Sequence, residues 1–494
     1  MFTTTATVLI RLESVARQVR LHFLSHRAER TAFRAARFMP DQSIRPAWSS
    51  GFAFYLATVG ASVGLGSIWR FPYLVGSDGG SAFIFAFFLA CLLIATPLLA
   101  AEFIIGRHSR ASPPRAAGVL AAQSTLSQRW NLIGILGTLA GFMIVSYYAV
   151  IAGWVMAYTW KCASGSLSGL SHAAVTAMWQ AFLADPWALG AWHLAFVALV
   201  ALISARGVTR GLEVANKIRA PVLLILMAIL VGYSIDTGDV RHGLAFAFAP
   251  NFKAITPSVV LAAIGQAFYA TGVGMAMMLA YGSYQKRGTS LVRSSLIISG
   301  AILLVSLLAT LIVFPLVFRY GMDPAQGVAL VFDVLATVFA EMPGGRLIGT
   351  LFFLLLVFAA LTPSLAAIEP LVAWLQQRQR CSRVAAVGVT ALAAWLTGIV
   401  AMLSFNRWAD VRPLRWLPGF QNKSLFDSID YISSNLLLPI GALATSLFIG
   451  WFVARSIVQD ELSESTPLAR KLCIALLRYL CPLAILAVFA ANIY

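Results

Sequence analysis

The chain has 494 residues, of which 60% are hydrophobic and only 11% are charged, and its mean hydropathy is +0.82. Water-soluble globular chains carry roughly a quarter charged residues, so this composition argues against that class and predicts an integral membrane protein. The net charge of +17 does not indicate nucleic-acid binding, because the basic residues lie in short loops between apolar runs, as topology signals do.

Residues 1–47 form an N-terminal segment that is rich in arginine and poor in acids. Three interpretations remain open: a basic amphipathic helix on an anionic membrane surface, a transit-like leader, or an extension upstream of a true start at Met39. We expect this segment to be cytoplasmic and to carry no functional domain of its own.

Eleven apolar segments are candidates to cross a bilayer, although the fourth and fifth are short. They lie near 49–75, 81–105, 132–161, 193–205, 220–234, 257–284, 294–318, 347–375, 384–403, 434–454 and 472–493. The loops richer in Lys and Arg alternate with poorer ones and are expected to be cytoplasmic. An odd number of spans places the C-terminus outside. Residues 48–455 then form a ten-helix core, and residues 456–494 a cytoplasmic loop and an eleventh helix.

The first apolar segment is interrupted. Gly60, Gly64 and Gly66 fall within seven positions, and Arg70 follows them. Glycine weakens a helix, and non-helical backbone at membrane depth survives only where it is buried in protein or lines a water-filled cavity. The pattern predicts a discontinuous helix, unwound near residues 62–66, whose free amides and carbonyls face a ligand. A kinked helix with a close-packing glycine face is the alternative, but an intramembrane arginine favours the functional interpretation.

A second break is predicted five segments later, near residues 270–274, where Gly272 and Gly274 lie mid-span beside polar groups. Interrupted helices at corresponding places in two five-helix halves indicate an inverted-repeat transporter with its site at the bilayer midplane. Because five is odd, the second half is inserted upside down relative to the first.

Several motifs match one known pattern. They are Trp48, Gly60 through Gly66, Arg70-Phe71-Pro72, Gly79-Gly80, Ala82-Phe83, Glu102, Gly106-Arg107, Tyr147-Tyr148, Trp154, residues 207–221, Asp427, Asp430 and Asn435. Together they resemble the neurotransmitter:sodium symporter family in its bacterial branch, from Trp48 to about Arg455. The resemblance implies an all-α, five-plus-five inverted-repeat fold with discontinuous first and sixth helices, and Na⁺-driven uptake of an amino acid or amine.

The resemblance also implies where a substrate would bind. A carboxylate would lie at the amides near Leu65 and Gly66, which suit an anion, and would be hydrogen-bonded by Tyr148 under a lid that includes Tyr269. Monoamine carriers have an aspartate where this chain has Gly64, so we expect an amino acid. The pocket is apolar, and a charged side chain would be left unpaired there, so the amino acid should be neutral. The expected substrate-binding residues are Ser62, Gly64, Leu65, Gly66, Ile144, Tyr148, Tyr269, Gly272, Met275, Ala276 and Ala367.

Two gates follow from the same pattern. Arg70 and Asp430 match the family's extracellular gate pair, which contributes little net energy in an exposed vestibule. Arg45 and Trp48 match the cytoplasmic gate, but Gln377 stands where an acid is expected opposite Arg45. The inner gate is therefore expected to be loose or closed by other contacts.

The family has one sodium site beside the substrate, and this chain departs from it. Ser67, Ala270 and Ile302 stand where the family has Asn, Thr, and Asn or Asp. Hard cations such as Na⁺ need oxygen ligands, and alanine and isoleucine supply none. With Ser67 alone remaining, this second site is expected to be lost or badly weakened.

The family's other sodium site links the first and eighth helices. The carbonyls of Gly60, Val63 and Ala359 and the hydroxyl of Thr362 match it, while Pro363 replaces a further hydroxyl. Pro363 also frees a carbonyl one turn earlier. A single Na⁺ is therefore expected, at this site.

Chloride and protons are the other ions on which the sequence bears. Chloride dependence is not expected, since Phe87, Ala270 and Ile302 stand where donors would be needed. Glu102 and Glu369 are intramembrane carboxylates and hence candidate proton sites. Carboxylates at both places also fit a structural role.

The predicted function is that of a symporter, coupled to Na⁺ through a single site, which imports a neutral amino acid across a bacterial cytoplasmic membrane by alternating access. A proton-coupled or uncoupled transporter of the same fold and a non-transporting amino-acid sensor are the alternatives. An enzyme is not expected, because no nucleophile, base and oxyanion arrangement is visible. The expected partners are the amino acid and the lipid bilayer, with a homodimer left open and no nucleic acid.

Overall fold

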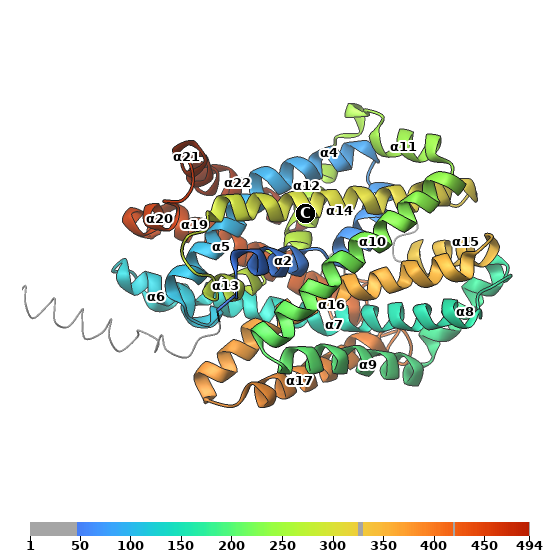
Figure 1. The fold of residues 1–494 in the computed structure, drawn as a ribbon, viewed down its shortest axis with the longest axis horizontal. Coiled ribbons are helices and arrows are strands. Elements are labelled where there is room, and N and C mark those ends of the chain that lie inside the picture. The colour runs from blue at the N-terminus through green and yellow to red at the C-terminus, as the bar shows by residue number, and fades with distance from the viewer. Residues whose placement is uncertain (1–46, 325–329, 418–419, 494) are drawn as a thin grey trace, which may run out of the picture.

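The structure is a computed structural model that describes residues 47–324, 330–417 and 420–493, with side chains described as far as residue 490. Within these ranges all regular structure is helical, as the sequence predicts. Figure 1 shows most of the long helices running in roughly one direction, with α2 (Gly51–Ser62) near the centre of the bundle. Arg45 and most of the basic N-terminal segment lie outside the described residues.

Nine helical stretches in the described part of the chain are long and apolar enough to cross a membrane. They are Ser81–Ser109, Gln128–Ser164, Pro186–Ala205, Val208–Thr237, Leu291–Arg319, Gly345–Gln379, Arg383–Leu403, Leu425–Phe452 and Pro467–Ala490. Their main α-helices are α4 (Ser81–Ala90), α5 (Thr96–Ser109), α7 (Leu132–Ser164), α9 (Pro186–Ala205), α10 (Val214–Thr237), α14 (Leu291–Arg319), α16 (Gly345–Gln379), α17 (Arg383–Leu403), α18 (Leu425–Asp430), α19 (Leu438–Leu447), α21 (Pro467–Ala475) and α22 (Cys481–Ile493).

Two further spans are broken. The first pairs α2 with a stretch Gly66–Ser77, which includes α3 (Phe71–Ser77), and the two parts are bent by 51°. The second pairs α12 (Pro257–Thr271) with α13 (Met277–Ser283). With these two, the helices are consistent with the eleven predicted segments. Short helices join them: α6 (Pro113–Gln123), α8 (His172–Ala184), α11 (Val240–Phe248), α15 (Leu335–Glu341) and α20 (Arg455–Glu461).

Three predicted segments are longer in the structure than their hydropathy suggests. The fourth begins at Pro186, where the Asp185 carboxylate accepts hydrogen bonds from two amides of the first turn, and the fifth extends over Val208–Thr237. The tenth begins at Leu425 rather than near residue 434, because Ser424 and Asp427 form a capping box. Each added part carries polar or capping residues, which hydropathy alone assigns to loops.

α7 packs along α16 and approaches the second helix break closely. A methyl group added at Gly137 would lie 2.8 Å from the Gly274 carbonyl oxygen, and one at Gly141 would lie 3.0 Å from that of Met275. Small residues let helix and backbone meet at this distance. The glycines of α7 therefore help to position the candidate site.

Candidate functional site

Both predicted breaks are present. α2 ends at Ser62, Val63 is extended with ψ of 96°, and regular structure resumes at Gly66. α12 ends at Thr271, and α13 begins at Met277. Between them Gly272, Gly274 and Ala276 have positive φ values of 68°, 87° and 57°. A left-handed alanine is uncommon, and backbone held in this way is often found at functional sites.

Side chains from neighbouring elements hold the two breaks. Glu102 of α5 accepts a hydrogen bond of 2.7 Å at Oε1 from the amide of Gly274. Gln266 donates through Nε2 to the Gly66 carbonyl at 2.7 Å. The Gly274 amide, which lies in the unwound backbone, thus has a polar partner, as buried backbone requires. Glu102, a candidate proton site, thus helps to hold the backbone of the second break through this hydrogen bond.

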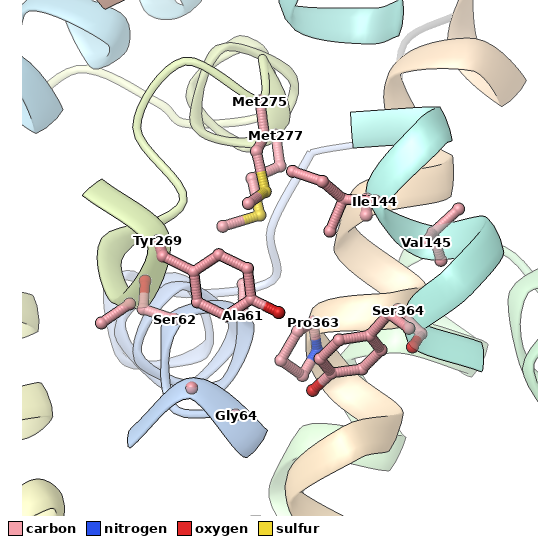
Figure 2. Close-up of a pocket in the computed structure, with 14 residues that line it drawn as sticks. Ala61, Ser62, Gly64, Ile144, Val145, Tyr269, Met275, Met277, Pro363 and Ser364 are labelled. Carbon is pink, nitrogen blue, oxygen red and sulfur yellow. The ribbon is translucent and has the colours of Figure 1, made fainter. Parts of the chain in front are cut away.

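A cavity of about 40 Å³ lies between the breaks. Figure 2 shows Met275 and Met277 directing their sulfur atoms into it, opposite Ile144. Of the expected substrate-binding residues, the following line it: Ser62, Gly64, Gly66, Ile144, Tyr148, Tyr269, Met275 and Ala367. Leu65, Gly272 and Ala276 are not among the lining residues. Lining residues that were not predicted for the substrate are Ala61, Val145, Ala270, Met277, Pro363 and Ser364.

Tyr148 brings a hydroxyl group to the wall of the cavity, and Leu65 lies behind it. The Leu65 amide donates to the Tyr148 hydroxyl at 3.1 Å, and both residues are buried. A hydroxyl that accepts from an amide still has a proton to donate. An anionic group placed beside this pair would therefore meet a donor.

The Tyr269 ring separates this cavity from a second one. The second cavity, of about 420 Å³, is lined by Tyr269 and also by Arg70, Ser434 and Asn435. The Arg70 guanidinium lies over the Tyr269 ring, 4.4 Å from its centroid, a cation–π contact. Ring and guanidinium together close the inner cavity on this side.

The predicted outer gate pair does not form a direct ion pair within the described residues. Asp430 instead accepts hydrogen bonds at Oδ1 from Tyr147 at 2.7 Å and from Ser434 at 3.0 Å. Arg70 contacts Tyr269 as described above. Aromatic hydroxyl and ring contacts therefore take the place of the direct pair in this conformation.

At the opposite end, Trp48 and Tyr284 close the path. The Trp48 amide donates to the Tyr284 carbonyl at 3.1 Å, and the two rings lie edge to face with centroids 6.1 Å apart. The Tyr284 hydroxyl donates to Glu369 Oε1 at 2.7 Å, and Arg383 lies 2.7 Å from Glu369 Oε2. Gln377 accepts a hydrogen bond from the Ser112 amide instead. Sequence reasoning missed the contribution of Arg383 to this closure, because the ion pair depends on which face of α17 carries that residue.

Another ion-pair cluster joins α20 to the end of α5. Arg107 Nε lies 2.7 Å from Glu461 Oε2, and His108 Nδ1 lies 3.0 Å from Oε1. Burial raises the pKa of Glu461, but hydrogen bonds from His108 and Arg107 outweigh burial and hold it below the ordinary 4.5. A carboxyl with a lowered folded-state pKa stabilises the fold above its unfolded pKa and loses that contribution as the pH falls.

We therefore expect acid to destabilise the protein partly through Glu461. Thermal unfolding of the purified protein should show stability falling as the pH drops below about 4.5, with a shallower fall in Glu461→Gln, which has no carboxylate to protonate. Identical pH slopes in the two proteins would show that the cluster contributes nothing measurable.

Two broken helices, supported from both sides around a closed apolar cavity, define a membrane transporter of the inverted-repeat class. The chain belongs to the sodium:neurotransmitter symporter family, whose model matches residues 45–181 and 186–494. Membership identifies a transporter rather than an enzyme and implies the use of Na⁺.

Two known proteins similar to this chain match it over most of their length, and a third matches it over less than half of its own. An uncharacterized sodium-dependent transporter of Bacillus subtilis, YhdH, is 36% identical over 445 residues, covering 90% of this chain and 96% of that protein. Mouse B(0)AT2, named a sodium-dependent neutral amino acid transporter, is 28% identical over 55% of this chain and 40% of its own. The solved structure of MhsT in complex with L-phenylalanine matches with a TM-score of 0.83 and 35% identity, covering 91% of this chain and all of that one.

The residues expected at the sodium site beside the substrate do not fit the ion. Ala270 and Ile302 are buried and offer no side-chain oxygen. Ser67 Oγ is buried and has no hydrogen-bond partner among the described residues. One hydroxyl does not replace a hydration shell.

The site between α2 and α16 keeps its expected oxygen ligands close together, but a cationic side chain reaches one of them. An added methyl at Gly60 would lie 3.1 Å from Thr362 Cγ2, and one at Gly64 would lie 3.5 Å from the Ala359 carbonyl oxygen. The Val63 carbonyl, however, accepts a hydrogen bond of 3.2 Å from Arg219 Nη1. One expected ligand of the predicted single sodium site therefore already accepts a hydrogen bond from a cation, supplied by a residue that the sequence analysis did not single out.

Proposed function

We propose that the protein carries a neutral amino acid across a bacterial cytoplasmic membrane by alternating access. The observation that carries the proposal is the cavity between the two helix breaks, which has a hydroxyl group at Tyr148 and is apolar around Ile144, Met275 and Met277. A zwitterion fits this division, since its carboxylate would meet the donors and its side chain the apolar wall. No carboxylate or basic side chain lines the cavity, so a charged side chain would be left without a partner.

Alternating access needs one closure on each side of the site. The Tyr269 ring with Arg70 would open toward one side, and the group of Trp48, Tyr284 and Glu369 toward the other. By the distribution of basic loops, the Trp48 side is cytoplasmic. No step of this cycle runs through Na⁺, because the residues at one expected site do not fit the ion and a cationic side chain reaches a ligand of the other.

The test is binding and uptake of a panel of amino acids by the full chain in proteoliposomes. L-Phenylalanine is the first probe, since it is the ligand of MhsT. We expect neutral amino acids to compete with labelled phenylalanine, while aspartate and lysine do not. Failure of every neutral amino acid to bind would reject the proposal, and binding without uptake would favour the sensor.

A further inference from the structure

Arg219 of α10 is the buried charge that the proposed function leaves unexplained. The residue is only 3% exposed, and among the described residues no carboxylate forms an ion pair with it. Its Nε has no hydrogen-bond partner within the same part of the chain. A buried cation without a counter-charge is costly, so its surroundings must stabilise it in another way.

Its surroundings are the carbonyls of the first helix break. Nη1 donates to the Val63 carbonyl at 3.2 Å, and a methyl group added at Gly60 would lie 2.8 Å from Nη2. The break lies at the C-terminal end of α2, where free carbonyls and the helix dipole give a partial negative charge. The guanidinium thus occupies the electrostatic environment that would otherwise attract a metal cation.

One expected ligand stands beside the guanidinium without a partner. The Thr362 hydroxyl is buried and makes no hydrogen bond to any described residue. Its side chain packs on Gly60, the same residue that Arg219 approaches from the other helix. The expected oxygen ligands therefore remain in the chain, and a charged side chain lies against two of the residues that supply them, Gly60 and Val63.

We propose that the guanidinium of Arg219 is a tethered substitute for Na⁺ at the site formed by Gly60, Val63, Ala359 and Thr362. A second positive charge about 4 Å away weakens cation binding by on the order of a thousandfold in a partly shielded interior. Arginine keeps its proton at any physiological pH, so Arg219 is a fixed charge and not a proton carrier. Ion release at this site is then absent from the cycle.

The first test does not depend on any substrate. Thermal unfolding of purified wild-type protein should give the same midpoint in NaCl as in choline chloride. Arg219→Ala removes the charge and leaves the oxygens, so Na⁺ should now raise the midpoint by roughly 3–5 °C at saturation, as a ligand of the native state does. A wild-type midpoint that rises by this amount with Na⁺ overturns the proposal.

Two further variants keep the test decisive. Arg219→Ala with Thr362→Val removes the hydroxyl as well, and the gain in Na⁺ response should disappear. Arg219→Lys retains a cation, and its midpoint should ignore Na⁺ as the wild type does. If Arg219→Ala does not fold, the wild-type and Arg219→Lys proteins still provide the test. A midpoint that rises with Na⁺ in both proteins contradicts the proposal that Arg219 takes the place of Na⁺.

The second test rests on the proposed function and separates the two ideas. Uptake of the amino acid by wild type should change less than twofold when choline replaces Na⁺, whereas Arg219→Ala should require Na⁺. Uptake by wild type that needs Na⁺ overturns the substitution but leaves amino-acid transport standing. Absence of any amino-acid binding rejects the function, while the unfolding midpoints still report on Arg219.

Discussion

Arg383→Met should lower the free energy of unfolding by about 3–5 kcal/mol, because it leaves the buried carboxylate of Glu369 without its counter-charge. The Glu369 side chain is 0% exposed, and its Oε2 lies 2.7 Å from Arg383 Nη2. Tyr284 still donates to Oε1 in the variant, but one neutral donor does not balance a buried charge. Denaturant or thermal unfolding in detergent measures the loss.

The matched control is the double variant Arg383→Met with Glu369→Gln. Removing both charges replaces the ion pair by neutral groups of similar size, so most of the lost stability should return. The variant would also test the inner closure, since Glu369 connects Tyr284 to Arg383. An Arg383→Met protein as stable as wild type would show that the pair contributes little to the fold.

Tyr148→Phe should weaken amino-acid binding by roughly 10-fold to 100-fold while leaving the fold intact. A hydrogen bond to a charged group is worth about 1.5–3 kcal/mol, and the Tyr148 hydroxyl is the side-chain donor beside the Leu65 amide. The change removes one oxygen and keeps the ring that lines the cavity. Equilibrium binding of labelled phenylalanine measures the effect.

Tyr158→Phe is a control on the same helix. Its hydroxyl is buried and has no hydrogen-bond partner among the described residues, and it does not line the cavity. Binding should be unchanged in this variant, and stability should stay level or rise slightly, because a buried unpaired hydroxyl is removed. Equal binding by the two phenylalanine variants and wild type would argue against a substrate contact for Tyr148.

The two helix breaks were predictable because glycine clusters inside apolar segments have few physical explanations. Gly60 to Gly66 and Gly272 to Gly274 mark both interruptions in the sequence, and the structure places non-helical backbone at both. The ends of the spans were harder to predict. Asp185 and Ser424 cap helices that begin before the hydrophobic run, and hydropathy carries no signal for a cap.

Residues that reach the site from other helices were the ones sequence reasoning missed. Met277 lines the cavity because Ala276 turns the chain through a left-handed conformation, which no propensity predicts for alanine. Arg219 lies in a segment that matched the family, yet nothing in its spacing shows that α10 turns this face toward α2. The available signal was a basic residue directly before the predicted fifth segment, two residues before Pro221.

A positive charge that stays attached to α10 has an electrical consequence. A zwitterion has no net charge, so a carrier that moves it together with Na⁺ gains about 2.3 kcal/mol from each 100 mV across the membrane, enough for roughly fiftyfold accumulation. Arg219 is part of the protein and returns with it in every cycle, so its charge does not cross the membrane. With Arg219 in the place of the ion, the membrane voltage would not concentrate the amino acid through this site, and the direction of net flow would follow the amino acid's own gradient.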